Sequence, residues 1–372
     1  MINTDILVIG SGIAGLCAAL EAARAGAGVV VASKGKSCAS AEVMGFNAPV
    51  HPDDDGGQFF EDIVKSGEGI NRTELARILA AESVKRIGYM EELGLTFDKN
   101  PDGTYNGMQA LGNAYPRIVH HKGITGAVSL KLLRQACLEK GVRFLSDVRI
   151  TDLLAEDNRV YGACGLKLGT DEFTAIAAGA VVLASGGCGA VHPVSTYPPA
   201  LIGDGYAMAY RAGAKLVDME FMQFEPCCFV YPKELEGRII VTTMLNEGGK
   251  LLNSRGEEFL LHDEPGYRLQ KGELARAIVR EIAAGRGTVH GGIFFDVTAL
   301  PKERVLVDCS LFSAPAMAAG IDMTKEACEV APAAHTFLGG TVVNGDCETT
   351  VRGLYAAGGG DRRPPRSQPA GR

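Results

Sequence analysis

The sequence of 372 residues lacks three features that would assign it to common classes of protein. Its most apolar stretch, "AIAAGAVVLASGGCGAV", is interrupted by glycine, so no segment is long and apolar enough to span a bilayer. The N-terminus has no basic region before its first apolar run, so we expect no signal peptide. The net charge of −7 argues against nonspecific binding of nucleic acid. We therefore expect a cytoplasmic protein with neither a nucleic-acid partner nor direct membrane insertion.

Paired cysteines are also missing. The ten cysteines stand singly except for Cys227 and Cys228, and no CxxC pair or His/Cys spacing suits zinc or an iron–sulfur cluster. We expect reduced thiols and no metal site. Glycine, by contrast, is abundant at 48 residues, which is typical of tight turns and of close backbone approach to a large ligand.

The first forty residues have the pattern of a βαβ unit. Residues 5–10, "DILVIG", predict a buried strand, an alanine-rich helix follows, and residues 28–33, "GVVVAS", predict a second strand. Gly10, Gly12 and Gly15 form GxGxxG where the first strand meets the helix, and this context favours a site for the pyrophosphate of a dinucleotide. The acidic residue that usually follows the second strand is replaced by Ser33-Lys34, and the motif alone does not separate FAD from NAD.

Later segments suggest a second domain. Residues 57–96 and 125–140 have helical patterns, and residues 142–168 predict antiparallel strands that turn at Asp157-Asn158. Residues 223–334 have a less regular pattern, and residues 335–358 return to strands. We therefore predict a first domain from residues 1–222 and 335–358, with residues 223–334 inserted as a separate domain.

Five further motifs occur in order along the chain: "SKGKSCASAEVMGFNAP", "AVVLASGGCG", "GDGYAMAYRAGAKLVDMEFMQFEP", "NEGGKLLNSRGEEFL" and "AAHTFLGGTVVNGDCETTVRGLYAAG". Together they resemble the flavoprotein subunits of fumarate reductase and succinate dehydrogenase, and L-aspartate oxidase. The resemblance covers residues 3–358. It implies bound FAD and an α/β fold, in which a Rossmann-like FAD-binding domain carries an inserted α+β capping domain at residues 223–334.

The resemblance also implies which residues contact the cofactor. A histidine carries the flavin covalently in the respiratory enzymes, but the matching position here is about Ala39 with no histidine nearby, so we expect non-covalent FAD. Asp204 is expected to face the cofactor, and it is also a candidate N-cap for the helix that follows. The expected cofactor-binding residues are Gly10, Ser11, Gly12, Ile13, Ala14, Gly15, Ser33, Lys34, Ser40, Gly45, Gly186, Gly187 and Asp204.

The catalytic residues implied by the resemblance are only partly present. His335 matches a histidine that holds a substrate carboxylate, and Lys271 stands where the family has its catalytic arginine. Lysine donates a proton if its pKa is lowered, but it cannot copy a bidentate guanidinium clamp. If the alignment with the family motif is shifted, Arg276 is the candidate for the catalytic arginine in place of Lys271.

Three other positions differ from the family pattern. Glu225 in "QFEPC" replaces a second histidine, and its charge would repel a dicarboxylate unless it were protonated. Thr242 and Leu245 in "VTTMLNEGG" replace the glutamate and arginine of the proton relay. With Lys271, these departures argue against fumarate, succinate or aspartate as the substrate.

Residues 359–372 differ in composition from the rest of the sequence. They hold four arginines and three prolines, and the family motif that should follow "GLYAAG" is missing. Codons exist for residues 357–372 that, after deletion of one G, encode Ala-Gly-Glu-Val-Thr-Gly-Gly-Leu-His-Gly-Ala-Asn-Arg-Leu-Ala-Gly, which is the family motif. We therefore predict a frameshifted, exposed tail; the alternative is a genuine basic, proline-rich tail.

The sequence thus predicts an FAD-dependent oxidoreductase that transfers hydride between flavin N5 and a small acid or enone. Because no cluster-binding motif is present, its electrons are expected to pass through a separate partner. The alternative is a truncated remnant that binds flavin without catalysis. An NAD-dependent dehydrogenase is disfavoured because there is no second dinucleotide motif.

Overall fold

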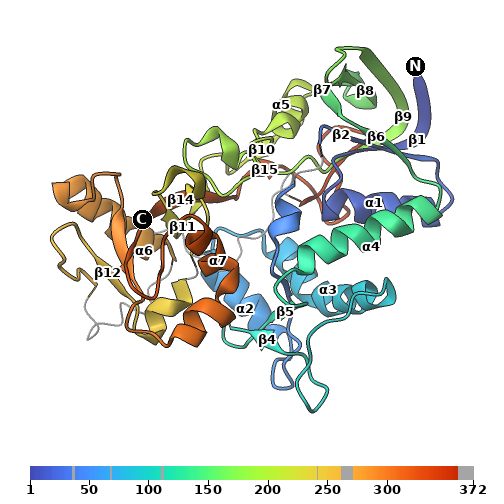
Figure 1. Cartoon of the computed structure of the whole chain (residues 1–372). Helices are drawn as coiled ribbons and strands as arrows, with labels where there is room; N and C mark the ends of the chain where they lie inside the picture. The colour runs from blue at the N-terminus through green and yellow to red at the C-terminus, as the bar shows by residue number, and fades with distance from the viewer. Residues whose placement is uncertain (36–37, 68, 110–112, 241, 261–270, 359–372) are drawn as a thin grey trace. The chain divides into compact units, whose positions relative to one another are not determined.

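The computed structural model describes residues 1–35, 38–67, 69–109, 113–240, 242–260 and 271–358 (Figure 1). Its chain divides into two compact units. The first contains Met1–Val191, Tyr197–Met222 and the described residues from Phe337 on, and the second contains His192–Thr196 and Gln223–Thr336. The predicted frameshifted tail, residues 359–372, lies outside the described residues, so its predicted exposure stays a prediction.

The first unit is built on a seven-stranded sheet whose centre is the predicted βαβ unit. Strands β1 (Ile2–Ile9) and β2 (Val29–Ser33) are parallel, and α1 (Ile13–Arg24) connects them. The sheet has the order β6-β2-β1-β9-β8-β7, and β16 also pairs with β9. The other strands are β6 (Arg143–Ser146), β7 (Val148–Glu156), β8 (Arg159–Lys167), β9 (Phe173–Leu183) and β16 (Leu354–Ala356).

The sheet combines a parallel core with an antiparallel arm. The core consists of neighbouring strands that all run parallel: β6, β2, β1, β9 and β16. In the arm, β8 runs antiparallel to both of its neighbours, β7 and β9. The β7–β8 turn lies at Asp157-Asn158, where both residues have positive φ (48° and 56°). Such a pair matches the twist of a two-residue hairpin, and the turn predicted from the sequence is confirmed.

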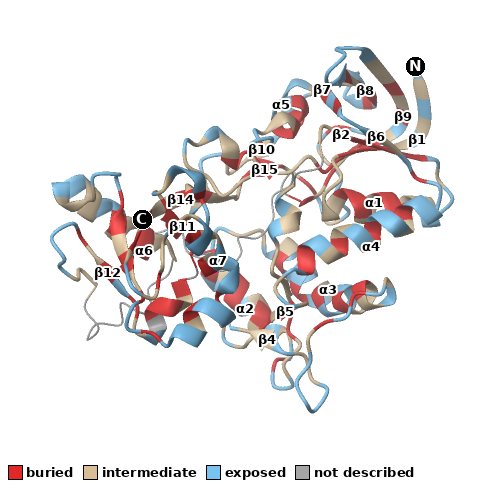
Figure 2. Cartoon of the chain, in the orientation of Figure 1, coloured by how far each residue is buried: buried red, intermediate tan, exposed pale blue. Residues whose placement is uncertain are grey.

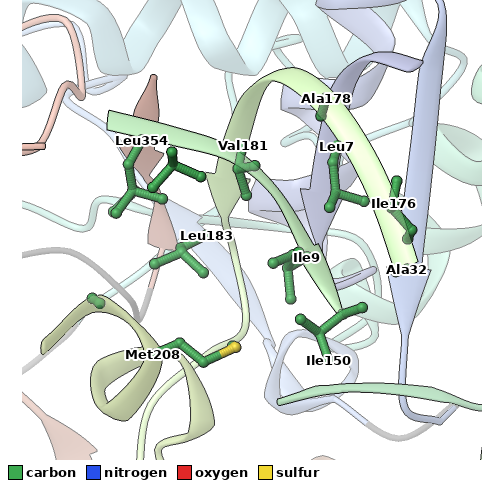
Figure 3. Packing of buried hydrophobic residues seen from close by; sticks show 14 of the residues in the cluster. Leu7, Ile9, Ala32, Ile150, Ile176, Ala178, Val181, Leu183, Met208 and Leu354 are labelled. Carbon is green, nitrogen blue, oxygen red and sulfur yellow. The ribbon is translucent and has the colours of Figure 1, made fainter. Parts of the chain in front are cut away.

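Alternate residues of the central strands fill two different cores, because successive side chains of a strand point to opposite faces. Leu7 and Ile9 pack with Val181, Leu183 and Leu354 on one face (Figure 3). Val8 packs on the other face, among the buried side chains of α1 and α4 (Thr125–Glu139). Figure 2 shows the buried residues along α1 and the central strands. A strand covered on both faces is apolar throughout, as "ILVI" and "VVVA" are.

The remaining elements of the first unit surround this sheet. The region predicted to be helical over residues 57–96 forms two helices, α2 (Gly57–Ser66) and α3 (Thr73–Glu92), separated at Gly67–Arg72. A small antiparallel sheet has the order β3-β5-β4, with β3 (Gly45–Asn47), β5 (Ile118–His120) and β4 (Gly107–Met108). Helix α5 (Asp204–Arg211) precedes β10 (Leu216–Val217), which pairs with β15 (Gly340–Thr341).

The second unit is an α+β fold with its own core. Its sheet has the order β11-β14-β13-β12, with β11 (Met222–Phe229), β14 (Cys328–Phe337), β13 (Ile293–Asp296) and β12 (Lys250–Leu252). The same unit contains helices α6 (Lys271–Glu281) and α7 (Ser310–Ala318). Phe229, Ile278 and Phe295 are fully buried in this core. The predicted fold class, an α/β fold with a Rossmann-like domain and an inserted α+β domain, is confirmed. Assignment of residues 1–222, 223–334 and 335–358 to FAD-binding and capping roles stays a prediction.

In the described part of the chain, no helix has both the length and the apolar character needed to cross a bilayer.

A buried ionic network holds together the α2 region of the first unit. Arg117 is completely buried and makes ion pairs with Asp54 and Asp62. Gln58 and the Ala114 N–H also donate to Asp62, each at 3.0 Å. Burial raises the pKa of Asp62, but the hydrogen bonds from Arg117, Ala114 and Gln58 outweigh it, so the pKa lies below its usual value.

We expect Arg117→Met to destabilise the chain by about 3–5 kcal/mol, because two buried carboxylates would lose their counter-charge. Urea unfolding monitored by circular dichroism measures the effect. The matched control is Arg86→Met, which removes an exposed helical ion pair to Glu82 and should change stability by less than about 1 kcal/mol. Equal effects of the two substitutions would contradict this role of Arg117.

The same network predicts a sensitivity to acid. A carboxyl whose pKa is lower when folded stabilises the protein above its unfolded pKa, roughly 3.9, and loses that contribution as the pH falls through the folded value. The unfolding free energy should therefore fall below about pH 4, and the fall should be shallower in Asp62→Asn. Unfolding curves between pH 3 and pH 6 measure this; identical pH dependence in both proteins would contradict it.

Candidate functional site

The turn between β1 and α1 has no room for side chains at two of its glycines. A Cβ on Gly10, whose φ is +113°, would lie 2.2 Å from the Ala184 carbonyl oxygen. A Cβ on Gly15 would lie 2.1 Å from the Gly10 carbonyl oxygen. At Gly12, which is the N-cap of α1, a Cβ would lie 3.1 Å from Ser40 Oγ. The first and third glycines therefore allow close packing of backbone, as the GxGxxG pattern predicts.

The N-terminus of α1 offers backbone donors rather than side-chain caps. No side chain caps the helix at Gly12, and its first turn contains no acidic residue. Ser40 is brought to this end, where its Oγ accepts a hydrogen bond of 3.2 Å from the Ile13 N–H. Because the first N–H groups of a helix have no partner within it, this end suits an anion such as a pyrophosphate.

A second glycine turn lies beside the first. Strands β1 and β9 are parallel neighbours in which Ile9 is opposite Leu183, so their carboxyl ends meet at one edge of the sheet. Ser185, Gly186 and Gly187 follow β9 at this edge, and Gly186 has a φ of +80°. Ser185 Oγ is buried and has no hydrogen-bond partner among the described residues. Such a hydroxyl is an unused donor and acceptor at the edge where α/β folds bind their ligands.

Lys34 and Asp204 form an ion pair in the first unit, although they are far apart in the sequence. Lys34 follows β2, and Asp204 is the first residue of α5. Gly203, with a φ of 88°, occupies the N-cap position of α5. The alternative role of Asp204 as the N-cap is therefore wrong. The pair connects two residues that the sequence analysis placed separately at the cofactor.

Gly45 has a structural reason to lack a side chain. It lies in β3, where a Cβ would be 2.6 Å from the Val119 carbonyl oxygen of the neighbouring β5. Its predicted contact with the cofactor stays a prediction. Around the two turns, the described residues present glycine backbone, the N-terminus of α1 and the buried hydroxyl of Ser185, which has no hydrogen-bond partner among them. These observations fit a dinucleotide group.

The predicted catalytic residues His335 and Lys271 belong to the second unit, where Glu225 joins them. Glu225 lies on β11 and is 3% exposed, His335 lies on the adjacent β14, and Lys271 begins α6. Lys271 Nζ lies 2.6 Å from Glu225 Oε2, and His335 Nε2 lies 3.9 Å from the same oxygen. Thr196 Oγ1 lies 3.0 Å from His335 Nδ1, which fixes one side of the imidazole ring.

The structure changes the interpretation of Glu225. The sequence suggested a lone anion that would repel substrate carboxylates, but Lys271 neutralises it. Arg276 is the weaker candidate, because five residues along α6 place it about 140° around the helix from Lys271. Thr242 and Leu245 are both buried, and Leu245 packs into the apolar core of the unit. Neither supplies a charge to this cluster.

The cysteines next to Glu225 are neutral thiols. All ten cysteines of the chain carry free thiols. Burial, followed by the charge of Glu225, raises the pKa of Cys227 and that of Cys228 well above the usual value for a thiol. They are therefore unsuited to act as nucleophiles. No group of three or more His, Cys, Asp or Glu side chains in the described residues has the arrangement of a metal site.

A family model described as an FAD-binding domain matches residues 5–359. The chain belongs to this FAD-binding family. It is 37% identical over 362 residues to one of the subunits of fumarate reductase (CoM/CoB) from Methanothermobacter marburgensis, covering 95% of this chain and 66% of that protein. It is 32% identical over 360 residues to L-aspartate oxidase of Clostridium perfringens, covering 95% of this chain and 79% of that protein.

Solved structures of flavoproteins have the same fold. Mycobacterium smegmatis Sdh1, solved in complex with UQ1, aligns with a TM-score of 0.88 at 32% identity, covering 97% of this chain and 64% of that chain. A variant of the E. coli quinol fumarate reductase FrdA aligns with a TM-score of 0.90 at 26% identity, covering 97% and 65%. The chain thus spans about two thirds of the length of several relatives.

Membership in the FAD-binding family confirms FAD as the cofactor, and the predicted resemblance to fumarate reductase and L-aspartate oxidase flavoproteins is confirmed with it. The individual contacts to FAD stay predictions. Sequence reasoning missed Ser185, although it stands immediately before Gly186-Gly187, which were predicted to bind the cofactor. We add it to the expected cofactor-binding residues.

We expect the FAD to be bound non-covalently, because no histidine occurs near Ala39. Acid precipitation should leave the flavin in the supernatant, where mass spectrometry identifies FAD. Cys38 is adjacent to Ala39 in the sequence and its thiol is a nucleophile, so Cys38→Ser is the matched control and should release the same amount. Flavin that stays with the precipitated polypeptide would contradict the prediction, and its release only in Cys38→Ser would identify the attachment site.

Proposed function

We propose that the chain is the flavoprotein part of an oxidoreductase that transfers hydride between flavin N5 and a small unsaturated acid or enone. FAD, when bound, supplies the hydride chemistry. The observation that carries the proposal is the cluster of Lys271, Glu225 and His335, which gathers an acid, its partner and a carboxylate-binding group within one folded unit.

Each residue of the cluster has a distinct task in this proposal. His335, oriented by Thr196, binds the polar group of the substrate. Lys271 donates a proton from Nζ to one carbon of the C=C bond, while the hydride adds to the other carbon. With FAD bound as the hydride source, the C=C bond would become a single bond, with one new C–H bond from the proton of Lys271 and one from the hydride. Glu225 holds Lys271 in place through the 2.6 Å contact and faces the amine that remains.

The electrons are proposed to come from a separate redox partner, since the chain has no cysteine spacing suited to an iron–sulfur cluster. The relative from M. marburgensis is one of the subunits of a fumarate reductase, which supports the proposal that this chain works together with other subunits.

The second candidate function is that of a remnant that binds FAD without catalysis. It predicts FAD-loaded protein with no turnover. Assay of the loaded protein with a reduced viologen dye and a set of enoic acids and enones separates the two.

We expect Lys271→Met to lower kcat by about 10²–10⁴, because a general acid typically contributes that factor. FAD content should be unchanged, since the cofactor residues lie in the first unit. Lys233→Met removes an exposed lysine of the second unit and is the matched control. Turnover by Lys271→Met at the unaltered rate would overturn the assignment of Lys271 as the proton donor.

A further inference from the structure

The second glycine turn of the first unit, residues 185–189, is covered by a later segment of the same unit, residues 197–205. A Cβ on Gly186 would lie 3.1 Å from Leu201 Cδ2. Leu201 is itself buried, so it has little freedom to move away. The side on which this glycine would carry a side chain is therefore filled by the covering segment.

Tyr197 covers two further glycines of the turn. At Gly189, the three atoms nearest to an added Cβ all belong to the Tyr197 ring, and Cδ2 would be only 2.0 Å away. At Gly187, the three nearest atoms again belong to Tyr197, with Oη at 2.9 Å. Neither glycine has a positive φ. The ring of Tyr197, and not the backbone conformation, therefore excludes a side chain at both positions.

The hydroxyl of Tyr197 connects the turn to a third segment. Tyr197 Oη accepts a hydrogen bond of 3.0 Å from the N–H of Phe337, the last residue of β14. The Phe337 ring packs against Tyr206 of α5, with ring centroids 5.2 Å apart, and Tyr206 is buried. An aromatic ring that is held both at its face and at its hydroxyl has few other positions available, and it restricts the turn against which it packs.

This turn lies at the edge of the sheet where the cofactor is expected. It follows β9, and a Cβ on Gly10 of the first glycine turn would lie 2.2 Å from the Ala184 carbonyl oxygen. Because Tyr197 and Leu201 fill its side-chain side, the turn has its backbone left to offer a ligand. A turn that already has its bound shape binds more tightly, since the apparent affinity falls with the fraction of molecules that have the competent shape.

From these contacts we propose that Tyr197 is a positioning residue for FAD, which holds residues 185–189 in the shape that receives the cofactor. The inference rests on FAD as the cofactor of the first unit. It does not depend on the substrate or on the hydride transfer of the proposed function. A residue with this role affects FAD binding more than other aromatic residues of the same unit do.

Tyr197→Ala removes the ring and the hydroxyl, so it should raise the dissociation constant of FAD by about tenfold or more, because the turn then adopts other shapes. Tyr197→Phe loses only the hydrogen bond to Phe337, and the increase should be about threefold or less. Equilibrium dialysis of the full-length chain against FAD measures both. The matched control is Tyr89→Ala, which removes a ring whose hydroxyl donates to Glu21, near the other end of α1. It should leave FAD binding unchanged.

Gly189 allows a second test through the same contact. Gly189→Ala alone should weaken FAD binding by about tenfold, because the new methyl group displaces the Tyr197 ring. In the Tyr197→Ala background that methyl group has room, so adding Gly189→Ala should change the dissociation constant by less than about twofold. Additive effects of the two substitutions would overturn the proposal. So would an unaltered FAD affinity in Tyr197→Ala.

Circular dichroism and urea unfolding of each variant separate a loss of FAD binding from a loss of the fold. If Tyr197→Ala does not fold, Tyr197→Leu replaces it in both tests, because leucine keeps apolar volume but has neither the ring nor the hydroxyl. A loss of FAD affinity in Tyr89→Ala equal to that in the Tyr197 variant would overturn the proposal. None of these measurements uses turnover, so an inactive, FAD-loaded chain would count against the proposed function alone.

Discussion

The close approach of backbone to backbone at the carboxyl ends of β1 and β9 is the constraint on which the first unit depends. A Cβ on Gly10 would overlap the Ala184 carbonyl, and a Cβ on Gly15 would overlap that of Gly10. In both contacts the obstacle is main chain, which cannot rotate away as a side chain would. Because the two turns pack this closely, α1 begins directly at the edge of the sheet, and the N-terminus of a helix suits an anion.

The same edge explains which parts of the cofactor site the sequence predicted. The strand, the glycine turn and the helix are contiguous, so their pattern is local and the βαβ unit was predicted correctly. The Asp157-Asn158 hairpin was predicted for the same reason. In contrast, Ser185 acquires its importance from the pairing of β9 with β1, in which Ile9 lies opposite Leu183 although the two are far apart in the sequence. Periodicity along the chain contains no information about that pairing.

The cluster of Glu225, Lys271 and His335 shows a different limit of prediction from the sequence. Comparison with the family motifs selected His335 and Lys271 and identified Glu225 as a departure, but treated each departure separately. In the structure, two of the departures contact each other across 46 residues, at 2.6 Å. A carboxylate that seems unfavourable at its position is stable there because its neighbour is also changed. Burial of either charge without the other would cost several kcal/mol, so each substitution is understandable only with its partner.

The contact between Lys271 and Glu225 can be compared with the glycine contacts of the first unit. The first unit retains the geometry of an FAD-binding fold, including the close glycine contacts that a dinucleotide requires. In the second unit, His335 contacts Thr196, and Glu225 forms an ion pair with Lys271. The cofactor imposes a fixed shape, since its phosphates demand backbone donors at one position. At the cluster of Glu225, Lys271 and His335, by contrast, two positions that differ from the family pattern form an ion pair with each other. Residues outside the cofactor-binding region, and with them specificity, can therefore differ between proteins that share this fold and cofactor.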